Sequence, residues 1–322
     1  MLDKFKFNRL AKKLFYIEEW NIGIIKRKQF EVNNIADCIL HSDIFWFKEY
    51  NTVQADPFVL EHNDSVYIFY ESLGLLNSKG DIRCRVLNKD LKELDDMLLI
   101  GLNDIQCHLS YPFCFEHGGK LFLIPESHEI NEVSLFECIN FPNEWKKVST
   151  LVSGIKLTDN SIVCSNGKYY LYSTDLNNNL VLHMSDDLLG NWKQISPNIK
   201  QCNQYTRGAG SPLYSQDSIF FFTQEGFDHN YGSAIFIKKI RSIGESEFSE
   251  ELIRKIEPVI GSYKDGIHTI NFSENYIVID SKRLKFNLFS FFIKLVYKIK
   301  TKLRKYKIKK KLEQPNCIKE RI

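Results

Sequence analysis

Acidic side chains recur at matched positions of a repeated segment, and they are the groups with which this chain could move protons. Asp56 lies near the start of the first copy and Glu71 closes it; Glu126 closes the second copy, 55 residues after Glu71. A further copy begins at Asp159. Carboxyl groups held near a reacting atom act as general acids and bases. We therefore take Asp56, Asp159, Glu126 and Glu71 as the candidate catalytic residues.

A second set of side chains at related positions is suited to binding. Tyr111 begins the second copy, Arg207 precedes the fourth and His268 opens the fifth, and the last two can contact a phosphate. The same residues have structural interpretations: Asp159 as a turn residue, Arg207 as an ion-pair partner, His268 as a hydrogen-bonded histidine. The candidate binding residues are Tyr111, Arg207, Ser211, Glu225, Tyr231 and His268.

The repeated segment itself predicts a β-hairpin. Residues 54–72 hold an apolar run, a polar turn and a second run rich in aromatic and β-branched residues, and this pattern is typical of two paired strands. Residues 111–127 repeat it with a Gly-Gly turn, and residues 159–175 with an Asn-Gly turn. Looser copies begin at Ser211 and Gly266.

Five strand-rich copies with a period of about 50 residues indicate a five-bladed β-propeller, an all-β fold. The intervals have room for further strands, for example at 82–87 and 133–138. A strand at 20–25 is expected to complete the last blade. Residues that open the innermost strands should meet at the centre, with the Gly210-Ser211 pair opening the fourth. We expect Glu71, Glu126 and Glu225 at the opposite end of the ring from Asp56.

Composition agrees with one domain in a reducing compartment. The chain has 322 residues, of which 43% are hydrophobic, enough for a sizeable core. Its eight cysteines form no C-x-x-C pair, which favours free thiols. No apolar segment follows the basic N-terminus, so we expect no secretion. The histidines have no metal-binding spacing and there is no Gly-rich phosphate loop.

Charge is divided unevenly along the chain. Residues 282–311 contain 13 Lys or Arg and no acid, whereas residues 1–281 have 28 basic and 38 acidic residues. The tail begins with a Phe-rich run too short to span a bilayer. It predicts an amphipathic helix lying on an anionic membrane, with a nucleic-acid-binding tail as the alternative. The expected division is 1–19 basic segment, 20–283 propeller and 284–322 membrane-associating tail, with the contact at 284–312.

Several motifs carry a resemblance to known propellers. They are A-D-P-F at 55–58, Y-P-F…P-E-S at 111–127, G-K-Y-Y-L-Y at 167–172, S-D-D-L-L-G-N-W at 185–192 and D-G-I-H-T-I-N at 265–271. Over about residues 15–283 the chain resembles the N-terminal propeller domain of glucosamine inositolphosphorylceramide transferases and its bacterial polysaccharide-biosynthesis relatives. It is more distantly similar to arabinanase and xylosidase propellers.

The glycosidase resemblance implies three carboxyl groups, and one is missing. Asp56 matches the general base and Asp159 the acid that tunes a pKa. The expected general acid falls on Gly210-Ser211-Pro212, where no side chain can protonate a leaving oxygen at neutral pH. The other acids would then have to serve. A transferase that uses an activated sugar donor does not need a strong general acid.

These observations leave three hypotheses. The first is a glycosyltransferase, or transferase subunit, of cell-surface polysaccharide or glycolipid biosynthesis, cytoplasmic and peripheral on the inner membrane face, with a carbohydrate or glycolipid acceptor. The others are an inverting glycoside hydrolase and a non-catalytic sugar-binding module. We expect no cofactor beyond an activated sugar donor; the resemblance leaves open a central ion beside His268.

Overall fold

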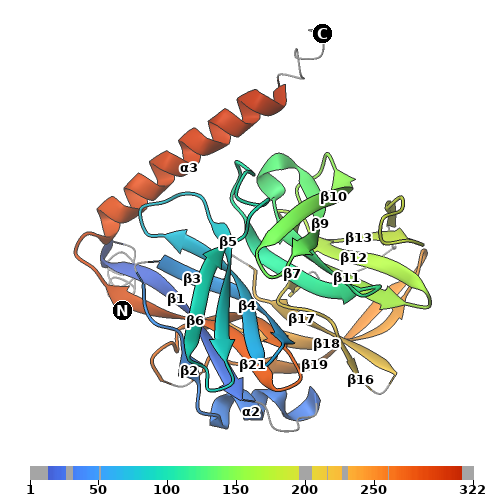
Figure 1. The fold of residues 1–322 in the computed structure, drawn as a ribbon, viewed down its shortest axis with the longest axis horizontal. Helices are drawn as coiled ribbons and strands as arrows, with labels where there is room; N and C mark the ends of the chain where they lie inside the picture. Colours follow the sequence, from blue (N-terminus) through green and yellow to red (C-terminus); the bar gives the residue numbers. More distant parts are fainter. Residues whose placement is uncertain are drawn as a thin grey trace, which may run out of the picture.

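The computed structural model describes residues 14–26, 32–50, 52–195, 205–215, 217–226, 231–259 and 261–313. Its strands form five antiparallel sheets, which are arranged in a ring around a central axis (Figure 1). The innermost strand of one sheet contacts that of the next: β3 contacts β7 and β20, and β11 contacts β7 and β15. The predicted five-bladed propeller is confirmed.

Each of the first three blades is a simple up-and-down sheet numbered outward from the centre. Blade one is β3 (Thr52–His62), β4 (Ser65–Gly74), β5 (Asp81–Asn88) and β6 (Glu93–Leu98). Blade two is β7 (Ser110–His117), β8 (Lys120–Glu126), β9 (Glu132–Asn140) and β10 (Glu144–Ser153). Blade three is β11 (Thr158–Ser165), β12 (Lys168–Thr174), β13 (Leu180–Ser185) and β14 (Lys193–Ile195).

The fourth blade departs from this pattern at its inner strand. It consists of β15 (Arg207–Gly208), β16 (Leu213–Ser215), β17 (Ser218–Gln224), β18 (Ile235–Ile243) and β19 (Phe248–Ile256). The Gly210-Ser211 pair does not open this strand as predicted but lies in the break between β15 and β16. Pro212 has no N–H for the ladder, and the Gly210 N–H bonds the Tyr111 hydroxyl at 2.7 Å instead of a strand.

The last blade joins the two ends of the chain. It consists of β20 (Gly266–Phe272), β21 (Tyr276–Phe286), β1 (Tyr16–Lys26) and β2 (Phe45–Trp46). The blue β1 lies beside the orange β21 in Figure 1, and the two pair from Tyr16 with Phe286 to Lys26 with Tyr276. The prediction that a strand around residues 20–25 completes the last blade is confirmed. Two short helices, η1 (Val32–Asn34) and α2 (Ile35–His41), connect β1 to β2.

Buried aromatic and aliphatic side chains fill the spaces between neighbouring blades. Phe69 of blade one meets Trp145 of blade two edge to face at 5.7 Å. Tyr172 of blade three meets Phe221 of blade four at 4.1 Å. Six cysteines, at 38, 84, 107, 114, 138 and 164, are free. Such packing fixes the blades relative to one another and so positions the side chains at the centre.

The helix α3 (Ser290–Glu313) leaves the last blade and lies outside the ring, drawn in red in Figure 1. The predicted C-terminal helix is therefore present. Among the described residues, no helix combines the length and apolarity needed to cross a membrane. Residues 1–13 of the expected basic segment 1–19 lie outside the described residues.

Candidate active site at the proximal end of the ring

The candidate acids gather at one end of the ring, which we call the proximal end: the end at which β3, β7 and β11 begin. Ala55 pairs with Glu71, and Ser110 pairs with Glu126. The expectation that Glu71 and Glu126 lie at the opposite end from Asp56 is therefore wrong. An antiparallel hairpin returns to the end from which it started, so its closing acid lies beside its opening residue. The hairpin turns form the distal end.

Three of the central residues occupy β-bulges with unusual backbone angles. The ladders are interrupted at Asp56, Tyr111 and Asp159, where φ is 52°, 44° and 49°. These values lie in the left-handed region, which residues other than glycine seldom adopt. A bulge redirects its side chain, and such strain clusters at functional sites. The inner strand of blade five is also bulged, between Ile267 and Ile270.

Hydrogen bonds hold Asp56 from both sides. Its Oδ1 accepts the Thr269 hydroxyl at 2.8 Å, and its Oδ2 accepts the Tyr111 N–H at 3.2 Å. The side chain of His268 approaches with Nε2 3.7 Å from Oδ1. Burial raises the pKa of Asp56 to about 7; His268 opposes the shift and two neighbouring carboxylates add to it. A carboxyl that titrates near neutral pH is suited to general acid or base chemistry.

Asp56, His268 and Asp280 are also the place to test for a metal ion, because they offer three ligand atoms within 4.8 Å of one another. Asp280 Oδ1 accepts the N–H groups of His268 at 3.1 Å and Thr269 at 2.8 Å. Its Oδ2 accepts the Asp56 N–H at 2.8 Å and lies 2.5 Å from His268 Nδ1. A carboxylate has about four lone-pair sites. Protein donors fill them all, so this set does not fit a bound cation.

His268 is fixed between these acids. Burial alone would lower the pKa of His268, but the Asp280 and Asp56 carboxylates outweigh it and raise the pKa. Its ring stacks on Trp20 with a centroid distance of 4.1 Å. The imidazole is therefore held by the protein on one face and at both nitrogens.

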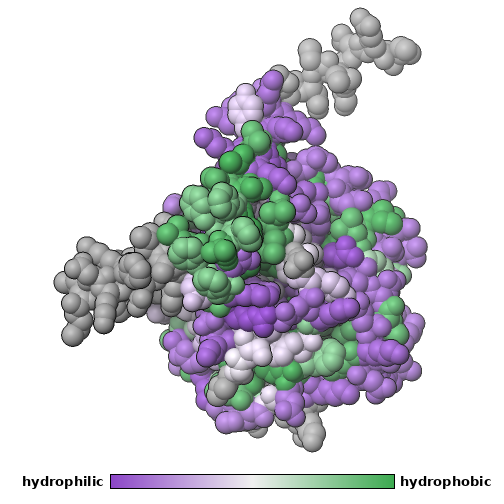
Figure 2. Space-filling model, turned by 90° about the vertical axis from the view of Figure 1, so that its left-hand side faces the viewer, coloured by the Kyte–Doolittle hydropathy of each residue, from purple (hydrophilic) through white to green (hydrophobic). Residues whose placement is uncertain are grey.

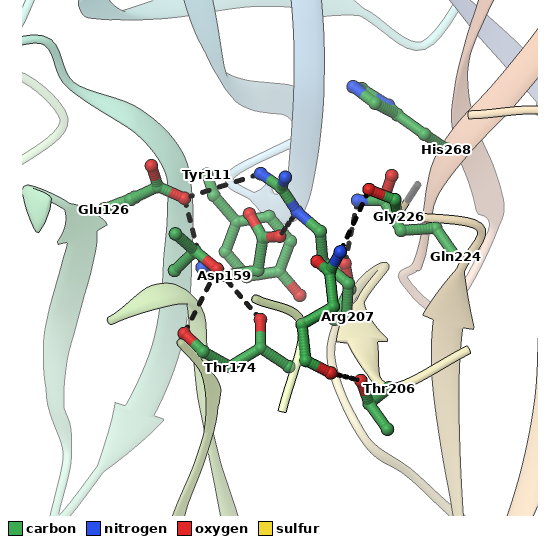
Figure 3. Close-up of polar contacts among 12 residues, drawn as sticks. Tyr111, Glu126, Asp159, Thr174, Thr206, Arg207, Gln224, Gly226 and His268 are labelled. Carbon is green, nitrogen blue, oxygen red and sulfur yellow. Dashed lines mark hydrogen bonds and ion pairs between the residues drawn. The ribbon is translucent and has the colours of Figure 1, made fainter. Parts of the chain in front are cut away.

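A second group of charges joins blades two, three and four. Figure 3 shows the guanidinium of Arg207 pointing toward the carboxylates of Glu126 and Asp159. Arg207 Nε contacts Asp159 Oδ2, and its Nη2 lies 3.9 Å from Glu126 Oε2. The Asp159 N–H donates to the same Glu126 oxygen at 3.2 Å. Tyr231 places its ring 5.1 Å from the Arg207 guanidinium carbon.

The two carboxyls of this group have opposite proton affinities. Burial opposes ionisation of Glu126, but a hydrogen bond from His128 at 2.7 Å, with Arg207 nearby, lowers its pKa to about 2. Burial raises the pKa of Asp159 despite Arg207. Two adjacent carboxyls whose pKa values are pushed apart can divide the acid and base roles. Of the two, Asp159 holds its proton more tightly and Glu126 loses its proton more easily.

Glu71 has a histidine partner of its own. His108 Nε2 lies 3.1 Å from Glu71 Oε1, and His108 Nδ1 accepts the Gly80 N–H at 2.9 Å. Because Nδ1 is an acceptor, the ring proton lies on Nε2 and is donated to Glu71. The backbone N–H of His108 donates to the carboxylate of Glu129 at 3.0 Å. His108 therefore holds the Glu71 side chain in place near Asp56.

The contacts described above join eight of the ten candidates, and Ser211 and Glu225 stand outside them. Ser211 lies in the break of the fourth inner strand, where its N–H donates to the side-chain oxygen of Asn271 at 2.7 Å. Glu225 directly follows Gln224, which pairs with Arg207, so Glu225 also lies at the proximal end and the expectation that it lies opposite Asp56 is wrong. Its Oε1 accepts no hydrogen bond among the described residues. The other eight are Asp56, Glu71, Tyr111, Glu126, Asp159, Arg207, Tyr231 and His268.

Sequence reasoning missed four residues that hold the candidates in place. Asp280 is the acid near the end of the fifth hairpin, one residue out of register with Glu71 in the first, so a search for closing acids could have found it. His128 follows Glu126 by two residues, and His108 precedes the second copy. Trp20 lies in the strand that completes the last blade, and only the ring closure brings it to His268. Its position had no local signal.

The comparisons with known proteins agree with this architecture. Residues 12–285 match the family model described as glucosamine inositolphosphorylceramide transferase 1, N-terminal. The chain belongs to this family. The transferase of Arabidopsis thaliana is 30% identical over 205 residues, which are 61% of this chain and 26% of that protein. The one from Oryza sativa subsp. indica is 26% identical over 205 residues, 61% and 27% of the two chains. This member of the family spans about a quarter of the length of these relatives.

Solved structures show the same fold at low identity. The native arabinanase of Bacillus subtilis has a TM-score of 0.51 and 11% identity, covering 71% of this chain and 93% of that one. Zg3597, a family 117 glycoside hydrolase of Zobellia galactanivorans, has a TM-score of 0.50 and 11% identity, covering 84% and 91%. At this identity the likeness concerns the fold alone.

Proposed function

We propose that this propeller transfers a sugar from an activated donor to a glycan or glycolipid acceptor, as an enzyme or as the subunit of one, at the inner face of a membrane. The observation that carries the proposal is the family match over residues 12–285, because the relatives that share it are named glucosamine inositolphosphorylceramide transferases. The proximal charge cluster supplies groups suited to such a reaction.

In this proposal Asp56 takes the proton of the acceptor hydroxyl. Its pKa of about 7 leaves a large share ionised at neutral pH while it keeps basicity. Thr269 and the Tyr111 N–H orient the carboxylate. Arg207, anchored by Glu126 and Asp159, faces the donor phosphate, and a phosphate leaves without a strong general acid. Positioning and charge stabilisation then supply most of the acceleration.

An inverting glycoside hydrolase is the second candidate, and one observation favours it. With Glu71 and Glu126 at the same end as Asp56, the missing acid of the fourth blade has substitutes within the site. Glu126 is held ionised, which makes it a poor proton donor. Asp159, whose pKa is raised, is the better proton donor in the same site. Hydrolysis would therefore use Asp159 as acid and Asp56 as base.

Product analysis tests these proposals. Purified protein is incubated with nucleotide sugars and lipid-linked acceptors, and products are read by mass spectrometry. Asp56→Asn is compared with Asp64→Asn, whose side chain is 83% exposed at the distal turn of the same hairpin. We expect a product one sugar heavier, reduced about 100-fold or more by Asp56→Asn and unchanged by Asp64→Asn.

Two other outcomes decide against transfer. Free sugar released from a glycan without a donor would establish the hydrolase. Acceptor binding that survives Asp56→Asn and Asp159→Asn, without product from any donor, would make the protein a sugar-binding module.

A further inference from the structure

The outer side of α3 is a stripe of exposed apolar side chains. They are 36% to 66% exposed and recur every three or four residues, the spacing of one helix face. Figure 2 shows this side of the molecule, where a green hydrophobic patch stands out from the mostly purple surface. The stripe consists of Phe292, Leu295, Val296, Ile299, Leu303 and Tyr306.

The opposite side of α3 is attached to the ring. Ser290 Oγ donates to the Tyr16 carbonyl at 2.9 Å, and Ile308 is buried. Ile299 is nine residues from each of them, about two and a half turns at 3.6 residues per turn. The stripe therefore points directly away from the propeller, where no described part of the chain covers it. The helix is oriented by its contacts and its apolar face is free.

Cations border the stripe on both sides. On a helix of 3.6 residues per turn, Lys298 and Lys302 fall along one border and Lys307 along the other. Lys309, on the first border, pairs with Glu313 at 3.6 Å. No acid lies between residues 282 and 311. An apolar stripe flanked by lysines matches the interface of an anionic bilayer, in which the apolar side chains enter the acyl boundary and the cations meet lipid phosphates. This charge complementarity identifies the occupant as anionic lipid.

The anchors of α3 all lie at the proximal end of the ring. Tyr16 pairs with Phe286, beyond the Trp20–Lys282 pair that flanks His268. Lys300 Nζ donates at 2.9 Å to the carbonyl of Leu76, shortly after β4 carries Glu71. These contacts belong to blades five and one.

The third anchor belongs to blade two and is the strongest. Arg304 Nη2 lies 2.8 Å from Glu129 Oε1, and Arg304 Nε lies 3.1 Å from its Oε2. Glu129 is buried in η2 (His128–Ile130), directly after the strand that ends at Glu126. A bidentate pair of this kind fixes orientation as well as distance. The helix thus crosses the proximal segments of three blades and is tied to each.

We propose that α3 lies on an anionic lipid surface and turns the proximal end of the ring toward it, so that a lipid-linked substrate reaches Asp56 and Arg207 from the bilayer. Only the part concerning the substrate rests on the proposed function. Docking and orientation follow from α3 itself.

Vesicle co-sedimentation of the full chain tests the docking. Vesicles of phosphatidylcholine with phosphatidylglycerol are compared with phosphatidylcholine alone. The Leu295→Asp/Ile299→Asp protein is compared with Leu94→Asp/Leu252→Asp, which changes residues 58% and 54% exposed on the blades. We expect binding to the anionic vesicles only, weakened at least about tenfold by the first pair and unaffected by the second.

Equal binding by the two double variants would overturn the docking. So would a chain that ignores both vesicles but self-associates in light scattering until Leu295 and Ile299 are changed, because the stripe would then cover a second copy. All four substituted residues are exposed, so folding is expected to survive, and thermal unfolding of each variant checks it.

Hydrogen exchange with and without anionic vesicles tests the orientation. We expect slower exchange in α3 and in segments 75–79 and 127–131, and no change at the distal turns 62–65, 117–120 and 166–167. Arg304→Ala should keep vesicle binding but lose the protection of 127–131. Protection of the distal turns instead, or of α3 alone, would overturn the orientation.

These measurements contain no substrate, so they remain informative if the protein proves to lack transfer activity. Conversely, transfer to a detergent-solubilised acceptor by a chain that fails to bind vesicles would overturn the docking and leave the proposed function standing.

Discussion

Replacing Asp280 by asparagine tests how the site is held together. The Asp280 carboxylate is fully buried; its Oδ2 accepts the N–H of Asp56 and its Oδ1 that of Thr269, both at 2.8 Å. Asparagine keeps nearly the same shape but turns one acceptor oxygen into an NH₂ group, which only donates. Whichever way the amide is turned, at least one buried backbone N–H then faces another donor.

The expected loss is large. A buried donor left unpaired costs about 1–3 kcal/mol, and breaking a buried charge pair, here with His268, costs about 3–5 kcal/mol. Because these effects overlap, we expect the free energy of unfolding to fall by about 3–5 kcal/mol. With a urea slope of about 3 kcal/mol per molar, the unfolding midpoint would fall by roughly 1–1.7 M.

The control is Asp186→Asn, which removes an ion pair with Lys168 at a position where the aspartate is 82% exposed. Exposed pairs contribute about 0–1 kcal/mol, so its midpoint should hardly move. Urea unfolding followed by tryptophan fluorescence measures both proteins. If Asp280→Asn shifts the midpoint no more than Asp186→Asn does, the hydrogen bonds inferred for the first and last blades do not stabilise the ring.

Three smaller changes probe the remaining contacts. Asp56 must be ionised to accept a proton, so transfer activity should rise with pH through about 7 and then level off; a flat profile would reject Asp56 as the base. Glu126 has its pKa lowered to about 2, so its contribution to stability is present above about 4.5 and lost as pH falls toward 2; His128→Ala should shrink that loss in acid unfolding curves. Tyr111→Phe removes the acceptor of a buried N–H 2.7 Å from its hydroxyl, lowering the free energy of unfolding by about 1–3 kcal/mol, whereas the exposed Tyr306→Phe should change nothing in the same urea assay.

The fold could be predicted because the sequence of each blade contains the local pattern of a β-hairpin. Alternating apolar residues and turn pairs such as Asn166-Gly167 recur at nearly constant spacing, and the closing strand contains the apolar run 22–25. Both signals depend on short-range rules. The break in the fourth inner strand depends instead on the Tyr111 hydroxyl, which comes from another blade 99 residues away. No local pattern contains that contact.

The membership of the site was predicted better than its geometry. The repeat identified Asp56 and Asp159, but placed Glu71 and Glu126 at the wrong end because the return of the hairpin was overlooked. Asp280 is one residue out of register with Glu71, since Ser281 is the residue that pairs before the bulge. Its role as an acceptor for two blades becomes visible only when the ring is closed.

The acids of the proximal end also explain how the strained inner strands are maintained. The N–H of each left-handed residue donates to a carboxylate of the preceding blade: Asp56 to Asp280, Tyr111 to Asp56, and Asp159 to Glu126. A left-handed residue costs about 1–3 kcal/mol, and a hydrogen bond to a charged acceptor contributes about 1.5–3 kcal/mol. The two are of similar size, so these hydrogen bonds can offset the strain of the bulges.

The same carboxylates therefore join the blades and form the candidate catalytic groups. For this reason a loss of activity in Asp56→Asn can be interpreted only together with the unfolding midpoint of the same variant. Asparagine retains an oxygen that can still accept the Tyr111 N–H, so a protein that unfolds near the wild-type midpoint but fails in transfer has lost a base. One that has also lost stability has lost the contact between blades one and two. The chain thus places its candidate catalytic groups where neighbouring blades must be held together, which is why each of the five blades contributes an ionisable residue to one site.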